Sequence, residues 1–333
     1  KLRAPNAKKV SVNVEHVGNF DMTKGDDGVW TYATKSLAPD IYGYSYAVDG
    51  VTHFDPLNPT IKTNMVWASN MVTVPGSPPE VWEVQNVPHG SITRHFYKSE
   101  IIGDERDYLV YTPPGFNSST KGLPVLYLLH GFSDTAVGWT DVGRAHVMMD
   151  NLIAQKKAKP MIVVMTLGYG IPDFVQRVMG GRRWNDDGVK SFSLFEEALL
   201  KEVKPAIERD YRTGTKPSQR AICGLSMGGA ESLYVGLRNP GLFSAIGAFS
   251  SGGLPAEKPE DVIPAFDPAK AKNLELIWMI CGTEDGLIGF QRGFSKWLKD
   301  KNAPVVTEET GGGHVWPLWR RNLASFAQKV FTK

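Results

Sequence analysis

The sequence of 333 residues has only two cysteines, Cys223 and Cys281, so it cannot carry a disulfide scaffold. It lacks any apolar run near the roughly 20 residues needed to cross a bilayer. Its 37 basic and 35 acidic side chains leave a net charge of +2. This balance gives no electrostatic reason to expect nucleic acid or a membrane as a partner. The chain starts at Lys1 without a methionine or signal peptide, so we expect a processed or trimmed chain.

Motifs for phosphate and metal binding are also missing. The sequence has no G-x-x-x-x-G-K-[ST] loop, no H-E-x-x-H helix and no cysteine–histidine pairs at metal spacing. The two cysteines fall in apolar strand-like segments, which indicates buried thiols without a redox role. We therefore expect neither a metal nor a cofactor.

The first ~75 residues have the pattern of short strands joined by turns. Ile41–Val48 alternates with a period of two, which puts its three tyrosines on one face. Asp49-Gly50 follows and predicts a tight hairpin, because both central residues need a positive φ. No helical pattern precedes residue ~140. The proline-rich stretch Pro75–Pro79 predicts a linker, so we divide the chain into an all-β, sandwich-like module at 1–78 and a domain at 79–333.

After the linker the pattern changes. Short strands are predicted at Val81–Val84, Ile92–Tyr97 and Tyr108–Tyr111. Continuous apolar runs then alternate with helical patterns, which is typical of buried parallel strands in an open α/β sheet. These runs are Leu123–Leu129, Met161–Leu167, Arg220–Cys223, Phe243–Phe249 and Leu274–Cys281, and helices are predicted near 142–157, 191–210, 226–238, 288–300 and 316–331. Pro205 should bend or break the second helix.

The motif Gly224-Leu225-Ser226-Met227-Gly228 lies between a predicted strand and a predicted helix. This is the context of the G-x-S-x-G nucleophile elbow, whose sharp turn lifts the serine hydroxyl out of the sheet. The flanking glycines are needed because strand and helix approach closely there. A chance match in a chain with 34 glycines is the alternative. The flanking elements favour a nucleophile at Ser226.

A serine nucleophile needs a base and a group that orients this base. In this type of fold both follow the serine along the chain, the acid first and the histidine last. His314 is the sole histidine beyond Ser226, which makes it the predicted base. Asp285 directly follows an apolar strand and is the predicted acid, with the adjacent Glu284 as the alternative.

Two backbone amides should stabilise the negative charge of the tetrahedral intermediate. One is the amide of Met227, directly after the nucleophile. The other is the amide of Phe132, in the segment Leu128-Leu129-His130-Gly131-Phe132 after an earlier strand. His130 precedes Ser226, which is the wrong order for the base, so we expect it to shape this loop by hydrogen bonding.

Residues 90–331 resemble carbohydrate esterase family 1, the feruloyl and acetylxylan esterases of the esterase D type. The resemblance rests on seven segments, which are Tyr111–Phe116, Leu128–Phe132, Gly138-Trp139, Tyr211-Arg212, Gly224–Gly229, Gly282–Asp285 and Gly313-His314. It implies an α/β-hydrolase fold with Ser226, Asp285 and His314 as the triad. The same scaffold also serves siderophore esterases, among others.

The first module resembles a family 48 carbohydrate-binding module, an early-set immunoglobulin-like sandwich. The matching segments are Gly28–Thr31, Leu37–Pro39, Tyr42–Tyr46, Val48–Gly50, Asp55–Pro59 and Val74–Gly76. The resemblance implies sugar binding, for which Trp30 and Trp67 are the predicted contacts. In the alternative, the three tyrosines face the core of the sandwich and the module is a packing partner.

The segment 168–195 should cover the mouth of the active site. Its aromatic residues Tyr169, Phe174 and Trp184 would suit a planar phenolic acyl group. In the alternative, Trp184 packs under the loop. The resulting hypothesis is a serine esterase that removes feruloyl groups from arabinoxylan or its oligosaccharides. We expect it to be secreted or periplasmic and part of a larger polysaccharide-degrading enzyme.

Three alternatives remain at this stage. An acetylxylan esterase or a siderophore esterase of the enterochelin type would use the same triad on another ester. A carbohydrate-binding protein with an inactive hydrolase scaffold would need no triad, and the presence of all three residue types disfavours it.

Overall fold

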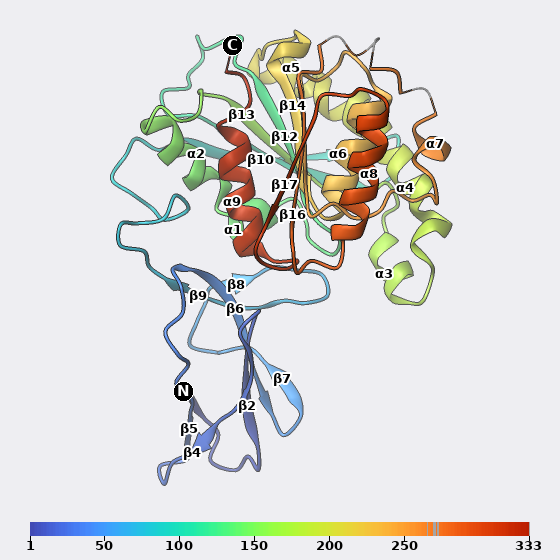
Figure 1. The fold of residues 1–333 in the computed structure, drawn as a ribbon. Helices are drawn as coiled ribbons and strands as arrows, with labels where there is room; N and C mark the ends of the chain where they lie inside the picture. The colour runs from blue at the N-terminus through green and yellow to red at the C-terminus, as the bar shows by residue number, and fades with distance from the viewer. Residues whose placement is uncertain (265, 269–270, 272, 333) are drawn as a thin grey trace.

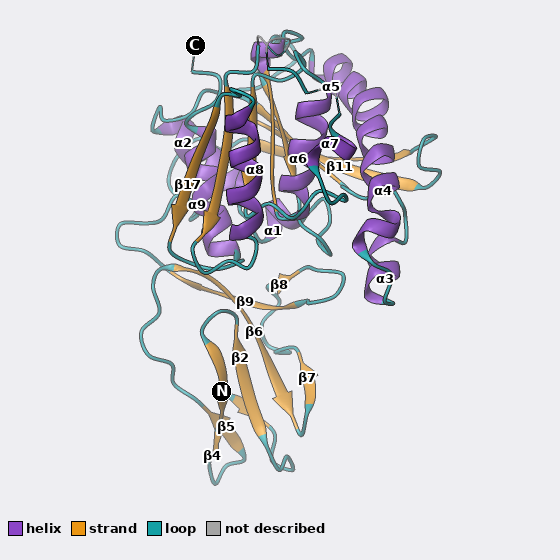
Figure 2. Ribbon diagram, turned by 45° about the vertical axis from the view of Figure 1, so that its right-hand side comes forward, coloured by secondary structure: helices purple, strands orange, loops and turns teal. Residues whose placement is uncertain are grey.

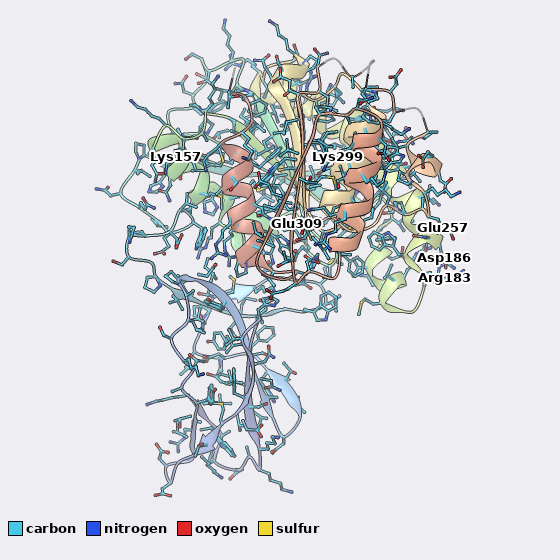
Figure 3. The ribbon with its side chains drawn as sticks, in the orientation of Figure 1. Lys157, Arg183, Asp186, Glu257, Lys299 and Glu309 are labelled. Atoms are coloured by element: carbon cyan, nitrogen blue, oxygen red, sulfur yellow. The ribbon has the colours of Figure 1, made fainter. Side chains whose placement is uncertain are left out.

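The computed structural model describes residues 1–264, 266–268, 271 and 273–332. The β-rich N-terminal part lies at one end of a larger α/β part, below it in Figure 1. Charged side chains such as Lys157, Lys299 and Glu309 are exposed on the outside of the α/β part (Figure 3). Among the described residues, no helix combines the length and the apolar character needed to cross a membrane.

The N-terminal part consists of short antiparallel strands in two sheets. One sheet has the order β1-β5-β4, and the other has the order β3-β2-β6-β9-β8, with β7 paired to β6. Their bounds are β1 Leu2–Arg3, β2 Val10–Val14, β3 Gly18–Asp21, β4 Thr23–Lys24, β5 Val29–Thr31, β6 Asp40–Val48, β7 Val51–His53, β8 Ile61–Lys62 and β9 Ser69–Val74. The immunoglobulin-like class of this part stays a prediction.

The predicted hairpin is confirmed. Val48 pairs with Val51, and the two residues between them, Asp49 and Gly50, have φ values of 49° and 89°. The tyrosines of β6 pack on the core of this part, where Tyr46 is buried and Tyr42 and Tyr44 are partly buried. The alternative that these tyrosines face the module's own interior is therefore correct.

Among its described residues, the α/β part is built on one sheet of eight strands with the order β10-β11-β13-β12-β14-β15-β16-β17. The first pairings are antiparallel, and from β13 onward the neighbours are parallel. Their bounds are β10 Ser91–Lys98, β11 Glu105–Thr112, β12 Val125–Leu129, β13 Ile162–Thr166, β14 Arg220–Leu225, β15 Ala245–Phe249, β16 Leu276–Gly282 and β17 Val305–Thr310. The predicted parallel strands are all present.

Helices cover both faces of this sheet (Figure 2). One face packs against α1, α2 and α9, and the other against α4, α5, α6 and α8, so that an apolar layer lies on each side. The bounds are α1 Gly138–Asp141, α2 Ala145–Ala154, α3 Phe174–Met179, α4 Trp184–Ala198, α5 Lys204–Tyr211, α6 Met227–Arg238, α7 Pro259–Val262, α8 Ile288–Asp300 and α9 Trp316–Ala327, with a short 3₁₀ turn at Pro217–Gln219.

The irregularity predicted at Pro205 is present. The long helical segment contains a π-helical turn at Leu199–Val203, between α4 and α5 and just before Pro205. Proline has no N–H to donate, so the regular hydrogen-bond pattern cannot continue through it.

The prediction of a strand at Val81–Val84 is wrong. These residues form turns, and the side-chain amide of Asn151 donates hydrogen bonds to the carbonyls of Val81 and Glu83, both at 2.8 Å. The carbonyls that a neighbouring strand would use are therefore taken by one side chain of α2. Trp82 is buried at this point and packs on the core of the α/β part.

A buried ion pair joins the two parts. Arg320 of α9 is fully buried and donates two hydrogen bonds to one carboxylate oxygen of Asp40, at 3.0 and 2.6 Å. It donates two more to the carbonyls of Ile41 and Val142. Arg321 binds the other carboxylate oxygen of Asp40 at 2.8 Å. These contacts fix the N-terminal part against α9, close to the loops that carry the site described next.

Candidate active site

Ser226 occupies a sharp turn between β14 and α6. Its φ of 52° and ψ of −116° are strained for a residue with a side chain. A Cβ on Gly228 would lie 2.5 Å from the carbonyl oxygen of His130, and one on Gly224 would lie 2.5 Å from the backbone of Gly228. The two glycines therefore allow the close approach of strand, helix and loop that the elbow motif requires.

His314 and Asp285 meet Ser226 in one chain of hydrogen bonds. The Nε2 atom of His314 lies 2.9 Å from the Ser226 hydroxyl oxygen, and its Nδ1 lies 2.9 Å from Asp285 Oδ2. The loop between β17 and α9 carries His314, and Asp285 follows β16. Glu284 is exposed, whereas Asp285 is buried, so the structure brings the preferred acid to the histidine rather than the alternative.

The surroundings of Asp285 favour its charged form. Burial by itself raises the pKa of this carboxyl, but hydrogen bonds from His314 and from the Leu287 amide, the latter at 2.9 Å, outweigh it and lower the pKa. An ionised carboxylate at this position holds the proton of the imidazole on Nδ1. The Nε2 atom is then left as the acceptor for the serine proton.

The loop after β12 lies against Ser226. A Cβ on Gly131 would lie 2.5 Å from the Leu225 side chain and 3.4 Å from the Cβ of Ser226, so the loop passes directly beside Ser226. Among the described residues, no group accepts a hydrogen bond from the backbone amide of Phe132 or from that of Met227. Both amides are available to a negatively charged oxygen bound at this place.

His130 acts within this loop as expected. It is buried, its Nδ1 donates to the Gly131 carbonyl at 2.8 Å, and its Nε2 accepts from the Gly168 amide at 2.9 Å. Burial lowers its pKa to about 4, so the ring is neutral at neutral pH and both nitrogens are used for structure.

Ser226 and His314 line a cavity of about 360 Å³ to which both parts of the chain contribute. Ser226, His314 and the 131–134 loop form one side, with Trp316 and Trp319 beside them. The N-terminal part supplies Glu15, Lys62, Asn64 and Trp67. Trp67, predicted as a sugar contact, is 58% exposed and so has an accessible ring at this cavity.

The predicted sugar contact at Trp30 is contradicted. Its side chain is 7% exposed in the core of the N-terminal part, and its indole N–H donates to the Ala4 carbonyl at 2.9 Å. A ring packed on its faces in this way offers no surface on which a sugar can stack.

The predicted substrate contacts at Tyr169 and Phe174 are also contradicted. Both are buried, and the Tyr169 hydroxyl donates to the Asp134 carbonyl at 2.9 Å. Trp184 is half-buried and packs edge-to-face on Phe132 and Phe174, with ring centroids 5.8 and 5.2 Å apart. These aromatic side chains form a support under the 131–134 loop and do not line the cavity.

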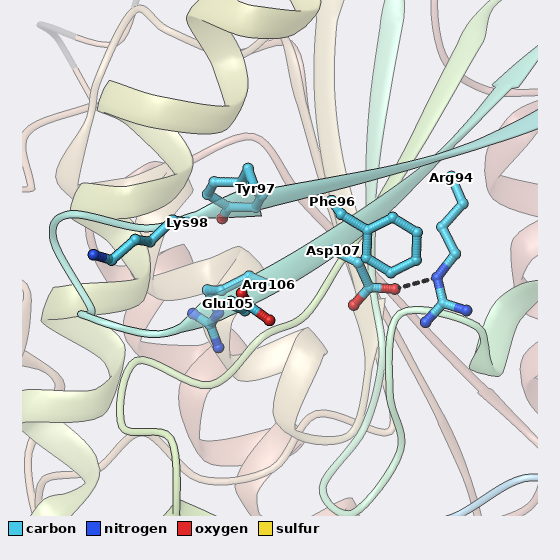
Figure 4. Close-up of a pocket in the computed structure, with 7 residues that line it drawn as sticks. All are labelled: Arg94, Phe96, Tyr97, Lys98, Glu105, Arg106 and Asp107. Atoms are coloured by element: carbon cyan, nitrogen blue, oxygen red, sulfur yellow. Dashed lines mark hydrogen bonds and ion pairs between the residues drawn. The ribbon is translucent and has the colours of Figure 1, made fainter.

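Another hollow, of about 550 Å³, lies on the hairpin of β10 and β11 (Figure 4). Arg94 lies over the ring of the exposed Phe96 and forms an ion pair with Asp107 at 2.7 Å. This hollow contains neither Ser226 nor Asp285 nor His314.

Across the part of the chain that the structure describes, no three His, Cys, Asp or Glu side chains are grouped so that they could hold a metal ion.

Sequence reasoning missed the residues that the N-terminal part contributes to the cavity. Glu15, Lys62 and Asn64 precede Ser226 by more than 150 residues, on the far side of the predicted linker. Lys62 forms a close ion pair with Glu15. Burial alone would raise the pKa of Glu15, but hydrogen bonds from His16 and Lys62 and the charge of Lys62 lower it to about 2. No local motif marks these residues.

Comparison with known proteins identifies the family of this chain. Residues 99–329, more than half of the chain, match the sequence model of the Esterase family. The chain belongs to this family. It is a carboxylic ester hydrolase with an α/β-hydrolase fold.

Two curated relatives are similar in sequence. An endo-1,4-beta-xylanase/feruloyl esterase from Xylanibacter ruminicola is 31% identical over 342 residues, in a match that covers 99% of this chain. This esterase chain spans 44% of the length of that relative. An acetyl esterase from Caldicellulosiruptor saccharolyticus is 24% identical, over 62% of this chain and 82% of its own length.

Two solved structures are similar in fold. The CE1 ferulic acid esterase from Anaeromyces mucronatus is 25% identical with a TM-score of 0.64, over 75% of this chain and 93% of its own. The enterobactin esterase from Shigella flexneri has a TM-score of 0.71 over 97% of this chain and 88% of its own. It is 17% identical, so this likeness concerns the fold, including the N-terminal part.

Proposed function

We propose that this esterase hydrolyses feruloyl esters on arabinoxylan through a Ser226–His314–Asp285 triad. The observation that carries the mechanism is the hydrogen-bond chain from Asp285 through His314 to Ser226, with 2.9 Å at both steps. These distances suit proton transfer from the serine to the histidine, which a serine nucleophile needs.

In this mechanism the Ser226 hydroxyl attacks the ester carbonyl while His314 Nε2 takes its proton. The amides of Phe132 and Met227 stabilise the resulting oxyanion. His314 then gives this proton to the sugar oxygen as its bond to the carbonyl carbon breaks, so the sugar leaves as an alcohol and the feruloyl group stays on Ser226 as an ester. A water molecule, deprotonated by His314, releases ferulate and restores the serine.

Two observations support the feruloyl class. The relative named endo-1,4-beta-xylanase/feruloyl esterase is similar along 99% of the chain, N-terminal part included. The cavity beside Ser226 also has the exposed ring of Trp67 at its edge, and the buried residues Trp316 and Trp319 border it. A flat aromatic ring at this place suits a planar hydroxycinnamoyl group, which an acetyl group would not need.

A panel of three esters tests this substrate class. Feruloylated arabinoxylan oligosaccharides, acetylated xylan and a catechol trilactone are offered to the wild-type enzyme at equal ester concentration. The proposal expects ferulate release to have the highest kcat/KM. Faster acetate release or trilactone opening would reject the feruloyl class and leave the triad mechanism in place.

Specific observations favour the other two esters. The acetyl esterase relative favours an acetylxylan esterase. The fold likeness to enterobactin esterase extends over 97% of the chain, which favours a siderophore esterase. We place the feruloyl class first because the xylanase/feruloyl esterase matches 99% of this chain at 31% identity. The enterobactin esterase matches 97% of this chain at 17% identity.

We further propose that the N-terminal part binds the polysaccharide through Trp67 at the cavity edge. Trp67→Ala should raise KM for feruloylated oligosaccharides by about 10-fold or more, while methyl ferulate, which has no sugar, is affected less. Leu57→Ala, at a side chain that is 92% exposed and outside the cavity, is the control. Equal effects of Trp67→Ala on both esters would refute sugar stacking.

An arabinoxylan substrate also implies a secreted or periplasmic enzyme, within a larger polysaccharide-degrading protein.

A further inference from the structure

The loop that carries the Phe132 amide is held from two sides. From within the α/β part, the His130 ring and the Tyr169 hydroxyl bind the Gly131 and Asp134 carbonyls. From the N-terminal part, the Asn64 side chain donates to Asp134 Oδ1 at 2.8 Å, and the Met65 amide donates to the Ser133 carbonyl at 2.8 Å. The second set of contacts joins residues 68 to 70 positions apart.

The amide of Asn64 can point in one direction only. Its side-chain oxygen accepts hydrogen bonds from the backbone amides of Val66 and Trp67, at 2.9 and 2.8 Å. A flipped amide would bring its NH₂ group against these two donors, so the observed orientation is the one that satisfies them. The NH₂ group is therefore aimed at Asp134 by the turn in which Asn64 itself lies.

The backbone of this loop is strained, so the loop depends on its surroundings to keep its shape. Ser133 is fully buried with a φ of 65°, a conformation that residues with side chains rarely adopt, and Asp134 is 4% exposed. Surrounding contacts must maintain such a backbone. The loop also begins at Gly131, whose backbone lies against Ser226. Movement at 133–134 would therefore shift the Phe132 amide relative to the nucleophile.

We propose that Asn64 is a positioning residue of the oxyanion hole, so that the N-terminal part completes the active site of the α/β part. This inference rests on the proposed serine-esterase mechanism. An oxyanion donor must lie within hydrogen-bond distance of the developing charge, and small displacements reduce the rate steeply. The N-terminal part would then be needed for hydrolysis of every ester, including those too small to touch it.

Three variants separate this role from others. Asn64→Ala removes the whole contact, and Asn64→Asp keeps an oxygen for Val66 and Trp67 but removes the donor to Asp134. Asn58→Ala is the matched control, because Asn58 lies in the same part and is also half-buried. Among the described residues, its side chain makes three hydrogen bonds, to Tyr44, Met71 and Thr60, and none to the 131–134 loop.

The measurements are kcat and KM on 4-nitrophenyl acetate and methyl ferulate, and inhibition by an arylboronic acid, whose serine adduct places an oxygen in the oxyanion hole. Both Asn64 variants should lower kcat on both esters about 10- to 100-fold. KM should stay within about twofold, and boronate affinity should fall in parallel with kcat/KM. Asn58→Ala should change neither quantity by more than about twofold.

Two results would overturn the inference. If Asn64→Ala and Asn58→Ala have equal effects, Asn64 acts through general stability. If KM rises on methyl ferulate alone, Asn64 contacts substrate instead of the loop. Failure of the proposed mechanism looks different, because Ser226→Ala would then keep its activity on the same esters.

Discussion

The buried carboxyl of Asp134 should make the free energy of unfolding depend on pH to a measurable extent. Burial raises its pKa from 3.8 to about 7, although the Asn64 hydrogen bond and the charge of Lys62 lower it in part. The folded protein thus holds this proton more tightly than the unfolded chain does. The stability that this difference provides is complete below the unfolded pKa of 3.8 and is lost as the pH rises through about 7.

Between about pH 5 and about pH 8.5 the free energy of unfolding falls by roughly 3 kcal/mol. The folded pKa of about 7 lies about two units above pH 5, and each unit corresponds to about 1.4 kcal/mol. Asp134→Asn abolishes this titration and keeps an oxygen that can accept from Asn64. Its free energy of unfolding relative to wild type should therefore rise by about 3 kcal/mol between the two pH values.

Urea unfolding followed by tryptophan fluorescence at both pH values measures this difference. Groups other than Asp134 contribute equally to the two proteins and cancel in the comparison. A free-energy difference between Asp134→Asn and wild type that is the same at both pH values would contradict a raised pKa of Asp134 in the folded protein. It would mean that Asp134 is already ionised in the folded protein well below neutral pH.

Two further predictions concern ion pairs at the junction and in the triad. Arg320→Leu leaves Asp40 buried with one arginine fewer and should destabilise the protein by about 3 kcal/mol or more, whereas the half-exposed Arg321→Leu should lose about 1 kcal/mol or less. Equal shifts in thermal melting would contradict this. Asp285→Asn should lower kcat by on the order of 10³- to 10⁴-fold and Glu284→Gln by less than about twofold, and the reverse order would reassign the acid.

Motifs whose geometry is local could be read from the sequence with good detail. The elbow around Ser226 needs a strand, two small residues and a helix, and these all lie within about 20 positions. The buried parallel strands are marked by apolar runs, because helices cover both of their faces. The hairpin at Asp49-Gly50 was predictable because few residue pairs accept two positive φ values.

Contacts across long distances in the chain could not be read in this way. The segment Val81–Val84 has apolar residues at both ends like a strand, yet the side chain of Asn151 takes its carbonyls. Aromatic residues such as Tyr169 and Trp30 suit a binding site and a core equally well, and only packing decides between the two. Their positions are set by neighbours that composition does not reveal.

The role of the N-terminal part shows this limit most clearly. A proline-rich linker suggested two separate units, and sugar binding was assigned to one of them and chemistry to the other. The cavity beside Ser226 instead takes side chains from both, among them Asn64 and Trp67. Burial of the Asp40–Arg320 pair at the junction keeps the two parts in one arrangement. Residues on both sides of the predicted linker therefore contribute to one cavity, which no local pattern in the sequence indicates.

The central claim, that Ser226 carries the acyl group, is tested most directly by covalent labelling combined with turnover. Wild type and Ser226→Ala are treated with a fluorophosphonate, the labelled peptide is identified by mass spectrometry, and ferulate release from feruloylated arabinoxylan oligosaccharides is measured in parallel. We expect one adduct per chain on Ser226, and loss of both label and ferulate release in a folded Ser226→Ala protein. A label on another residue, or ferulate release that persists in Ser226→Ala, would contradict it.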